Sequence, residues 1–377
     1  MKVLVTGGAG LIGSHLVDAL LAQGDAVRIL DNLEPQTHPA CRPAWMPKNA
    51  ELIEGDLRSH KAVVRALRGV EVVFHQAAFG GFTTELSKYA DVNVGGTVRL
   101  LEVIRAERLP VRKIVVASSQ ALYGEGLYTC QAHSSQQPPL RSLEQCEQQR
   151  WELECPVCRT PMPALPTPEE KRPDGVTIYA LSKAAEERWS LALGRAMGVA
   201  VVALRYAVTY GPRQSLFNPY TGVVSIFSTR LLNGLPPVLY EDGHQTRDFI
   251  FVEDIVRANL LVMDTPAADG QAFNVGTGRA TSVRDLVRLL GTALGCPREP
   301  LLRGEFRPGD VRHLVHDTRR LEGLEFRARV SLAEGLAKTV AWIRSQGSVD
   351  EAFTAAESGL RAHGVVRSAA TSVAVGG

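Results

Sequence analysis

Residues 1–22 read MKVLVTGGAGLIGSHLVDALLA. The apolar run Val3–Thr6 predicts a buried strand, and the apolar spacing of Leu11–Ala22 predicts a helix directly after it. Glycines 7, 10 and 13 would allow a tight turn, close approach of a pyrophosphate and close packing of helix on strand. A glycine pattern alone indicates only a turn, but the strand and helix on either side favour dinucleotide binding. The residues expected to form this site are Gly7, Gly10, Leu11, Ile12 and Gly13.

Working outward from this segment, short apolar runs alternate with longer helical patterns. This alternation predicts a doubly wound α/β fold, with a parallel sheet covered by helices on both faces. The sequence contains no internal repeat. The expected strands are Val3–Thr6, Ala26–Leu30, Leu52–Glu54, Val72–His75, Ile114–Ala117 and Val201–Leu204, and the expected helices are Leu11–Ala22, Lys61–Leu67, Gly96–Ala106 and Ala180–Ala196.

The alternation also indicates how the chain is divided. We expect a nucleotide-binding domain over residues 1–205, with an insertion rich in Gln and Pro over residues 126–173. A smaller α/β substrate domain, interleaved with the first, is expected over residues 206–345. The remainder, residues 346–377, is expected to be a partly disordered extension with one helix near Ala352–Ala362.

Composition excludes several classes of protein. Hydrophobic residues make up 45% and charged residues 22%, as in ordinary globular proteins. The formal net charge of +2 is too small for an electrostatic nucleic-acid binder. No apolar run approaches the ~20 residues that cross a bilayer, and residues 1–10 lack a signal-peptide pattern. We therefore expect a cytoplasmic protein with reduced cysteines and no nucleic-acid or membrane partner.

Polar residues follow the predicted strands, where the carboxyl edge of a parallel sheet binds ligands. Asp31 ends the second strand, at about the distance where an acid bonds the adenosine ribose hydroxyls. A carboxylate there would repel a 2′-phosphate, so the sequence favours NAD over NADP; the alternative is a simple strand-end turn residue. The other residues expected to contact the cofactor are Asn32, Asp56, Leu57, Gln76, Ala77, Ala78 and Asn93.

Tyr179 and Lys183 lie four residues apart, on one face of a predicted helix. An ammonium beside a phenol favours the ionised form, so Tyr179 could act as a base. A Tyr-x-x-x-Lys spacing alone is common on exposed helices. Together with Ser119 at the end of the fifth strand and the glycine loop, it predicts a catalytic set of Ser119, Tyr179 and Lys183, with the last two also contacting the cofactor.

Further motifs make the chain resemble the extended short-chain dehydrogenase/reductases, and within them the nucleotide-sugar epimerases and dehydratases. The resemblance covers about residues 1–343 and implies a Rossmann fold, an NAD cofactor, a nucleotide-sugar substrate and a homodimer formed through the helices around 96–106 and 180–196. Beside the glycine loop and Tyr179/Lys183, the segments that carry it are SSQALYG at 118–124, YGPRQ at 210–214, RDF at 247–249, FNVGTG at 273–278 and RPGD at 307–310.

The resemblance implies that Arg247 and Arg307 grip the diphosphate of the substrate. Guanidinium groups are bidentate phosphate donors, so the residue type suits this role. The alternative is a pair of surface arginines in salt bridges. The full set of residues expected to contact the substrate is Ser119, Gln120, Asn218, Arg247, Arg307 and Asp310.

Two departures from the family pattern bear on the reaction. Dehydratases of this family carry an Asp-Glu pair after the catalytic hydroxyl residue, where this chain has Gln120 and Ala121. Those side chains have no proton to give, so loss of water is disfavoured. The family often has Asn where this chain has Val208, so a substrate contact is expected to be rearranged.

Within the family, the segments 122–126 and 215–222 and the cysteine-bearing insertion are most similar to the dTDP-L-rhamnose 4-epimerase subgroup. This implies NAD-dependent 4-epimerisation through a transient 4-keto sugar. The alternatives are a 4-epimerase of UDP-hexoses or UDP-hexuronates and a nucleotide-4-ketosugar reductase. A different class, a non-enzymatic NAD-sensing scaffold, would not need Ser119, Tyr179 and Lys183 together.

The insertion carries two pairs of metal-ligand residues, each pair separated by two residues. Cys130 and His133 form the first pair, and Cys155 and Cys158 form the second. Two such pairs fit a tetrahedral structural zinc site. The alternative is a flexible loop whose thiols cluster by chance, and Cys146 has no paired spacing.

Overall fold

The structure is a computed structural model that describes residues 1–39, 42–80, 85–220 and 222–369. Cys41, Thr221 and most of the C-terminal end for which disorder was predicted lie outside the described residues. Within these ranges, no helix is both long and apolar enough to span a bilayer.

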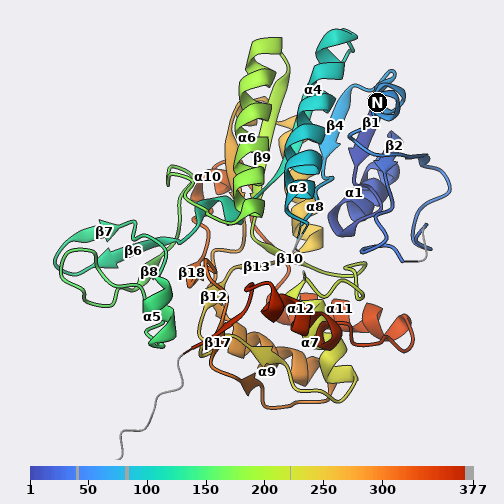
Figure 1. The fold of residues 1–377 in the computed structure, drawn as a ribbon. Coiled ribbons are helices and arrows are strands. Elements are labelled where there is room, and N and C mark those ends of the chain that lie inside the picture. Colours follow the sequence, from blue (N-terminus) through green and yellow to red (C-terminus); the bar gives the residue numbers. More distant parts are fainter. Residues whose placement is uncertain (40–41, 81–84, 221, 370–377) are drawn as a thin grey trace, which may run out of the picture.

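A parallel sheet of seven strands forms the upper lobe in Figure 1. Its order is β3-β2-β1-β4-β5-β9-β14, and every neighbouring pair is parallel. The predicted doubly wound α/β fold is therefore confirmed. The strands of this sheet are β1 (Lys2–Thr6), β2 (Ala26–Asp31), β3 (Glu51–Glu54), β4 (Val72–His75), β5 (Lys113–Ser119), β9 (Ala200–Tyr206) and β14 (Ala272–Val275).

Helices cover both faces of this sheet because each strand is apolar on both sides. Val3 and Val5 of β1 pack with α1 and α8, whereas Leu4 between them packs with α2 and α4. Burying one such side chain stabilises the fold by about 1.5–3 kcal/mol. All six strands and all four helices expected from the sequence occur, with ends within two residues of the prediction. The covering helices are α1 (Leu11–Ala22), α2 (His60–Leu67), α4 (Thr97–Ala106), α6 (Ile178–Met197) and α8 (Val252–Asp264).

The lower lobe is built mainly from three helices around a separate apolar core. These are α7 (Val223–Leu232), α9 (Val283–Leu294) and α11 (Leu332–Ser345). The chain enters this lobe after β9, returns to the upper lobe for α8 and β14, and then goes back. No single cut in the chain therefore separates the lobes. The short strands of the lobe are β10 (Val208–Tyr210), β11 (Val238–Leu239), β12 (Thr246–Arg247), β13 (Phe249–Phe251), β15 (Thr281–Ser282), β16 (Leu301–Leu302), β17 (Glu305–Phe306) and β18 (His313–Leu314).

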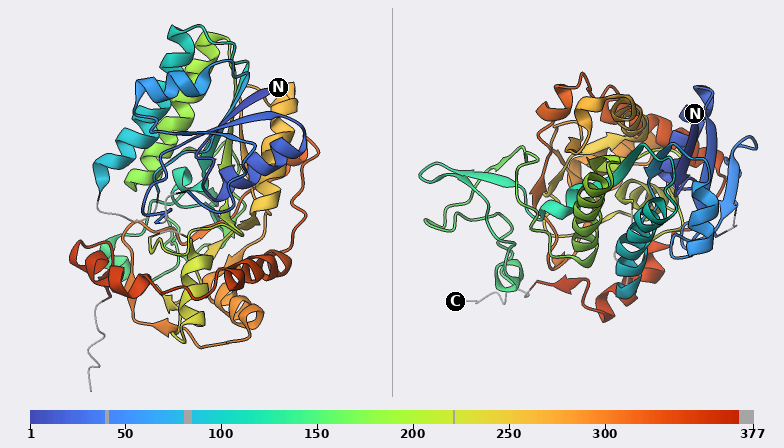
Figure 2. Two further views of the ribbon diagram at one scale, coloured as in Figure 1. Left: turned by 90° about the vertical axis from the view of Figure 1, so that its right-hand side faces the viewer. Right: turned by 90° about the horizontal axis from the view of Figure 1, so that it is seen from above.

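The insertion projects to one side of both lobes (Figures 1 and 2). Its three short strands form one small sheet, in which β6 lies between β7 and β8. Its apolar cluster holds only five buried residues, which is little for a segment of this length. The elements of the insertion are β6 (Leu127–Cys130), β7 (Ser134–Gln136), α5 (Leu143–Glu147) and β8 (Ala164–Leu165).

The C-terminal extension packs against the lower lobe. Its helix α12 (Phe353–Ala362) begins one residue after the predicted start, and β19 (Arg367–Ser368) pairs antiparallel with β17. Ion pairs Arg303–Glu357 and Arg361–Glu305 join the two segments. The remaining short elements are α3 (Leu86–Tyr89), η1 (Ala90–Gly96), η2 (Gln120–Tyr123), η3 (Pro266–Ala268) and α10 (Arg319–Glu322).

The close packing of α1 on β1 leads to the first prediction. A Cβ added at Gly13 would overlap the carbonyl oxygen of Gly7, whereas one added at Gly10 would have 3.5 Å to its nearest neighbour. We expect Gly13→Ala to lower the free energy of unfolding by about 1–3 kcal/mol or more, as overpacking does. The matched control Gly10→Ala should unfold near the wild-type denaturant midpoint. Equal midpoints for the two variants would contradict this account of the loop.

Candidate active site

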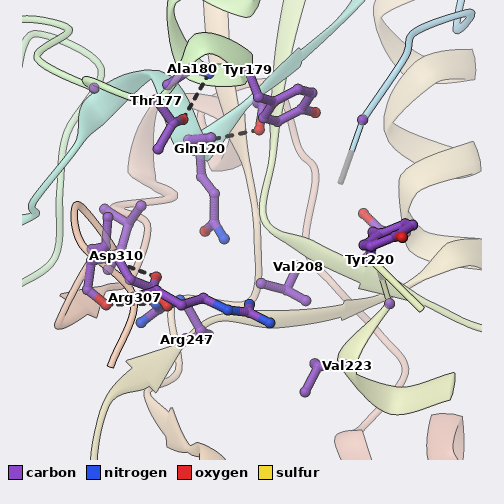
Figure 3. A pocket seen from close by; sticks show the side chains of 18 of the residues that line it. Gln120, Thr177, Tyr179, Ala180, Val208, Tyr220, Val223, Arg247, Arg307 and Asp310 are labelled. Atoms are coloured by element: carbon purple, nitrogen blue, oxygen red, sulfur yellow. Dashed lines mark hydrogen bonds and ion pairs between the residues drawn. The ribbon is translucent and has the colours of Figure 1, made fainter. Parts of the chain in front are cut away.

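A cavity of about 700 Å³ lies between the two lobes. Ser119, Gln120 and Tyr179 line it from the upper lobe, and Arg247 and Arg307 line it from the lower lobe, together with Asp310. Figure 3 shows Gln120 and Tyr179 on one side, with the two arginines and Asp310 on the other. The cavity therefore joins residues that are up to about two hundred positions apart in the sequence.

The glycine loop lies at the carboxyl end of β1. Gly7 has a φ of +68°, and a Cβ there would lie 2.7 Å from the Cα of Ala77, so glycine is required at this position. Gly10 caps α1 without a side-chain hydrogen bond, which leaves the first N–H groups of that helix to an anionic group. Leu11 and Ile12 line the cavity.

Asp31 is buried at the end of β2, beside the glycine loop. Its Oδ2 accepts a hydrogen bond from the Ala9 N–H, and its Oδ1 accepts one from the Leu33 N–H, both at 2.9 Å. Two backbone donors thus hold the carboxylate in one orientation at the ribose end of the predicted cofactor site.

The other predicted cofactor residues at strand ends form hydrogen bonds within the protein. Asn32 donates to Asp56 at 3.0 Å, and hydrogen bonds from Arg58 hold the pKa of the Asp56 carboxyl down to about 2, against the effect of its partial burial. Gln76 bonds Asn259, and the Ala77 N–H donates to Thr6.

The remaining predicted cofactor residues differ in exposure. Leu57 is buried in the upper core, whereas Ala78 is exposed. Asn93 donates both amide hydrogens within the protein, to the Phe79 carbonyl and to the Ser182 hydroxyl. Its geometry is that of a brace between the loop after β4 and helix α6, and its predicted contact with the cofactor stays a prediction.

Ser119 and Tyr179 reach the cavity from β5 and α6. The Ser119 hydroxyl accepts a hydrogen bond from the Ala121 N–H at 3.1 Å, which fixes its position at the start of η2. Thr177 caps α6 by accepting from the Ala180 N–H, so Tyr179 lies in the first turn of the helix. The Tyr179 ring packs edge-on against Tyr89, with 6.3 Å between ring centroids.

Lys183 lies behind the cavity wall. Its ammonium donates to Glu186 Oε2 at 2.5 Å, and both side chains are buried. Burial raises the pKa of Glu186 to about 7, against the opposing effect of Lys183. Burial, with Lys183 as the second cause, lowers the pKa of nearby His75 to about 3. In this structure the Lys183 ammonium thus bonds Glu186, and its predicted contacts with Tyr179 and the cofactor stay predictions.

Arg247 is aimed at the cavity by the segment that follows Asp310. Its guanidinium donates to Asp310 Oδ1 at 2.9 Å and to the carbonyls of Val311 at 2.6 Å and Arg312 at 3.2 Å. The next residue, Asp248, accepts from the N–H groups of Thr277 and Gly278. Through these bonds the FNVGTG segment holds the RDF segment in place beside the cavity.

The structure adds cavity residues that the sequence had not indicated. Tyr240 follows β11, and the Arg307 guanidinium lies over its ring at 4.4 Å from the centroid. Phe353 and Val365 reach the cavity from the C-terminal extension. The short strand before Tyr240 was not among the predicted strands, and nothing local marks Phe353 or Val365. Asn218, predicted to contact substrate, is buried, and its Oδ1 accepts from the Tyr220 N–H.

The four predicted metal ligands lie together in the insertion. The Sγ atoms of Cys130 and Cys158 are 3.6 Å apart, and His133 Nδ1 is 3.4 Å from Cys130 Sγ and 3.5 Å from Cys155 Sγ. All four ligand atoms lie within 4.8 Å of one another. A tetrahedral zinc site with Zn–S bonds of about 2.3 Å and Zn–N bonds of about 2.0–2.1 Å separates its ligands by about 3.5–3.8 Å. The donor set and its spacing therefore fit zinc.

Comparison with protein families decides the family of this chain. The model of the NAD-dependent epimerase/dehydratase family matches residues 3–150 and 160–276. The chain belongs to this family. The resemblance inferred from the motifs is thereby confirmed.

Known members of the epimerase/dehydratase family match along nearly the whole chain. The dTDP-L-rhamnose 4-epimerase of Burkholderia thailandensis is 35% identical, over 92% of this chain and 95% of that protein. The UDP-glucose 4-epimerase of Thermotoga maritima, solved with UDP-glucose, is 32% identical with a TM-score of 0.76, covering 92% and 99% of the two chains. That of Thermus thermophilus, solved with NAD, is 33% identical with a TM-score of 0.73, covering 93% and 100%.

The family match stops at residue 150 and resumes at 160. The unmatched residues contain the ligand pair Cys155 and Cys158. This epimerase/dehydratase chain therefore carries half of its candidate metal site in a segment outside the family pattern.

The position of Asp31 leads to a prediction about the cofactor. We expect the protein to bind NAD about tenfold or more tightly than NADP, because the fixed carboxylate repels a 2′-phosphate. Asp31→Asn keeps a hydrogen-bond acceptor but removes the charge. The dissociation constant for NADP divided by that for NAD should therefore fall. Fluorescence titration with both cofactors measures this ratio. Tighter NADP binding by the wild type would contradict the assignment.

Proposed function

We propose that this protein is an NAD-dependent 4-epimerase of a nucleotide-activated sugar. The observation that carries the proposal is the shared cavity: Tyr179 faces two arginines across it, Ser119 lines it too, and it lies next to a glycine loop suited to a dinucleotide. The identified relatives, which include 4-epimerases of dTDP- and UDP-sugars, support the same chemistry.

The residues divide the work along the cavity. Tyr179 takes the proton of the sugar 4-hydroxyl and gives it back to the same oxygen when the 4-keto group is reduced again, and Ser119 hydrogen-bonds that oxygen. NAD bound beside the glycine loop would supply the acceptor and donor of the hydride, so no outside reductant would be consumed. Arg247 and Arg307 hold the diphosphate while the 4-keto sugar rotates between them and Tyr179, so that its opposite face receives the hydride.

Epimerisation is favoured over dehydration by the residue beside Ser119. Gln120 points into the cavity in Figure 3, and its amide has no acidic proton to protonate a leaving hydroxyl. Ala121 has no functional group at all. A reductase that uses NADPH is disfavoured by Asp31, and a non-enzymatic scaffold would have no use for the Ser119–Tyr179 pair.

For the substrate we propose dTDP-L-rhamnose, converted to dTDP-6-deoxy-L-talose. The similarity to the Burkholderia enzyme and the segments 122–126 and 215–222 support this choice. Val208 lines the same cavity as Gln120 and Arg247, and an apolar side chain there suits a 6-deoxy sugar. UDP-hexoses and UDP-hexuronates are the competing substrates.

The experiment is incubation of the purified protein with dTDP-L-rhamnose, UDP-glucose and UDP-glucuronate, with the C4 configuration followed by NMR. We expect dTDP-L-rhamnose to be epimerised without added reductant. Tyr179→Phe is the matched control and should lower turnover at least ~10²-fold, because the general base is lost while the ring remains. Epimerisation of UDP-sugars alone would contradict the substrate but not the reaction.

We also propose that this protein is a homodimer. Helix α6 exposes Leu181 and Trp189, which are 56% and 47% exposed, on the outer side of the upper lobe. Helix α4 lies beside α6 in both views (Figures 1 and 2), so two copies could pack these helices together around a two-fold axis.

We further propose that Cys130, His133, Cys155 and Cys158 bind one structural zinc ion. Four protein ligands would close the coordination shell and leave no position for water or substrate. The small apolar cluster of the insertion supports this role, because a segment with so little core needs another constraint.

Elemental analysis of protein purified without added metal tests the zinc proposal. We expect about one zinc per chain, and Cys155→Ser should abolish it, since one lost thiolate opens the shell. Cys146→Ser is the control, because Cys146 is a buried cysteine of the same insertion outside the ligand cluster. If the wild-type protein contained no metal and all four side chains were chemically reactive, the zinc proposal would be wrong and the insertion would be a loop without a metal site.

A further inference from the structure

Arg307 and Asp310 lie on a loop that runs from Phe306 to Arg312. The insertion contacts both ends of this loop. We propose that the zinc-bound insertion positions this loop and thereby sets the affinity of the protein for the diphosphate of its substrate. This inference rests on the proposed function, since it assigns a role in substrate binding to the insertion.

The first anchor holds Phe306 at the start of the loop and Asp310 further along it. The ring of Trp151 packs on Phe306, the fully buried residue directly before Arg307, with 6.2 Å between centroids. Arg141 donates from Nη2 to the Asp310 carbonyl at 2.9 Å and from Nη1 to the Trp151 carbonyl at 3.2 Å. One insertion guanidinium, with its side chain 2% exposed, therefore ties the aromatic anchor to the loop itself.

The second anchor holds the end of the loop. Arg312, 1% exposed, donates from Nε and Nη2 to Glu152 Oε1 of the insertion, at 3.0 and 2.6 Å. Its other side-chain hydrogen bonds go to Glu241 and Asp242 of the lower lobe, at 2.7–3.0 Å. Glu152 also bonds the His313 ring at 3.0 Å. Arg312 is thus shared between the insertion and the substrate lobe.

The anchored segment also aims the other cavity arginine. Arg247 donates to Asp310 Oδ1 and to the carbonyls of Val311 and Arg312, which belong to the segment that the two anchors hold. The placement of both arginines toward the diphosphate therefore depends on the same short stretch of chain. A displacement of that stretch would move both guanidinium groups at once.

The four candidate zinc ligands lie close in sequence to residues of both anchors. Trp151 and Glu152 precede Cys155 by four and three residues, and the pairing of Leu153 with Met162 and of Cys155 with Thr160 closes the turn around the second ligand pair. Few apolar contacts besides the metal ligands hold this turn. Without zinc, Glu152 and Trp151 would lose their fixed position, and Arg312 would keep only its lower-lobe partners.

The test measures binding of dTDP and of UDP to the full-length protein by calorimetry, with NAD binding as an internal reference. Arg141→Met keeps the zinc ligands and the stem of the side chain but removes the guanidinium. We expect it to raise the dissociation constant of the diphosphate about tenfold or more, because the loop loses a buried tie. Zinc content and NAD affinity should stay at wild-type values.

Loss of zinc should also raise the dissociation constant of the diphosphate. We expect Cys158→Ser to weaken diphosphate binding and to raise KM with little change in kcat, since Ser119 and Tyr179 lie on other elements. Arg150→Met is the matched control: the Arg150 side chain is 51% exposed and bonds Gln148 and Glu154 within the insertion. It should leave zinc content, KM and diphosphate affinity unchanged.

Glu152→Gln keeps the shape of the second anchor and guards against a variant that fails to fold. Wild-type diphosphate affinity in folded Arg141→Met and Glu152→Gln proteins would overturn the inference. So would wild-type affinity in the zinc-free protein. If the wild type binds neither dTDP nor UDP, the proposed function itself fails; if it binds them and the variants bind equally well, only the role of the insertion fails.

Discussion

The seven strands of the sheet all run in the same direction, so their carboxyl ends meet along one edge. The glycine loop after β1, Asp31 after β2 and Ser119 at the end of β5 therefore lie on the same side of the upper lobe. Helix α6 then brings Tyr179 to this edge from its first turn. The lower lobe covers the edge and supplies Arg247 and Arg307, which completes a cavity open to a nucleotide sugar.

The segment around Arg307 is where separate parts of the chain meet. The lower lobe holds it through Arg312, the insertion through Arg141 and Glu152, and the C-terminal extension through the pairing of β19 with β17. Binding a diphosphate requires guanidinium groups at defined positions, and long flexible side chains need such supports to hold them. The insertion and the C-terminal extension thus both contact the segment that carries Arg307, while the glycine loop, Asp31 and Ser119 lie at the edge of the sheet.

The insertion also shows how a polar segment can be given a fixed shape. Its apolar cluster is small, and the segment projects to one side of both lobes. Four ligand atoms within 4.8 Å of one another offer a local constraint that does not depend on a large core. Such a constraint allows a segment with little core to place individual side chains, here Trp151 and Glu152, against a neighbouring lobe.

The sequence by itself determined the sheet, its helices and the glycine loop, because period and strand ends are local properties of the chain. A strand end and a Tyr-x-x-x-Lys spacing singled out Ser119 and Tyr179, and the tertiary structure brings both to one cavity. The sequence also indicated the four metal ligands, since each pair lies within one turn. Only the tertiary structure decided that Lys183 bonds Glu186, that Tyr240 and the C-terminal extension line the cavity, and that the insertion holds the loop after Phe306. These contacts join residues far apart in sequence, or choose between partners of similar chemistry, and burial and packing decide them.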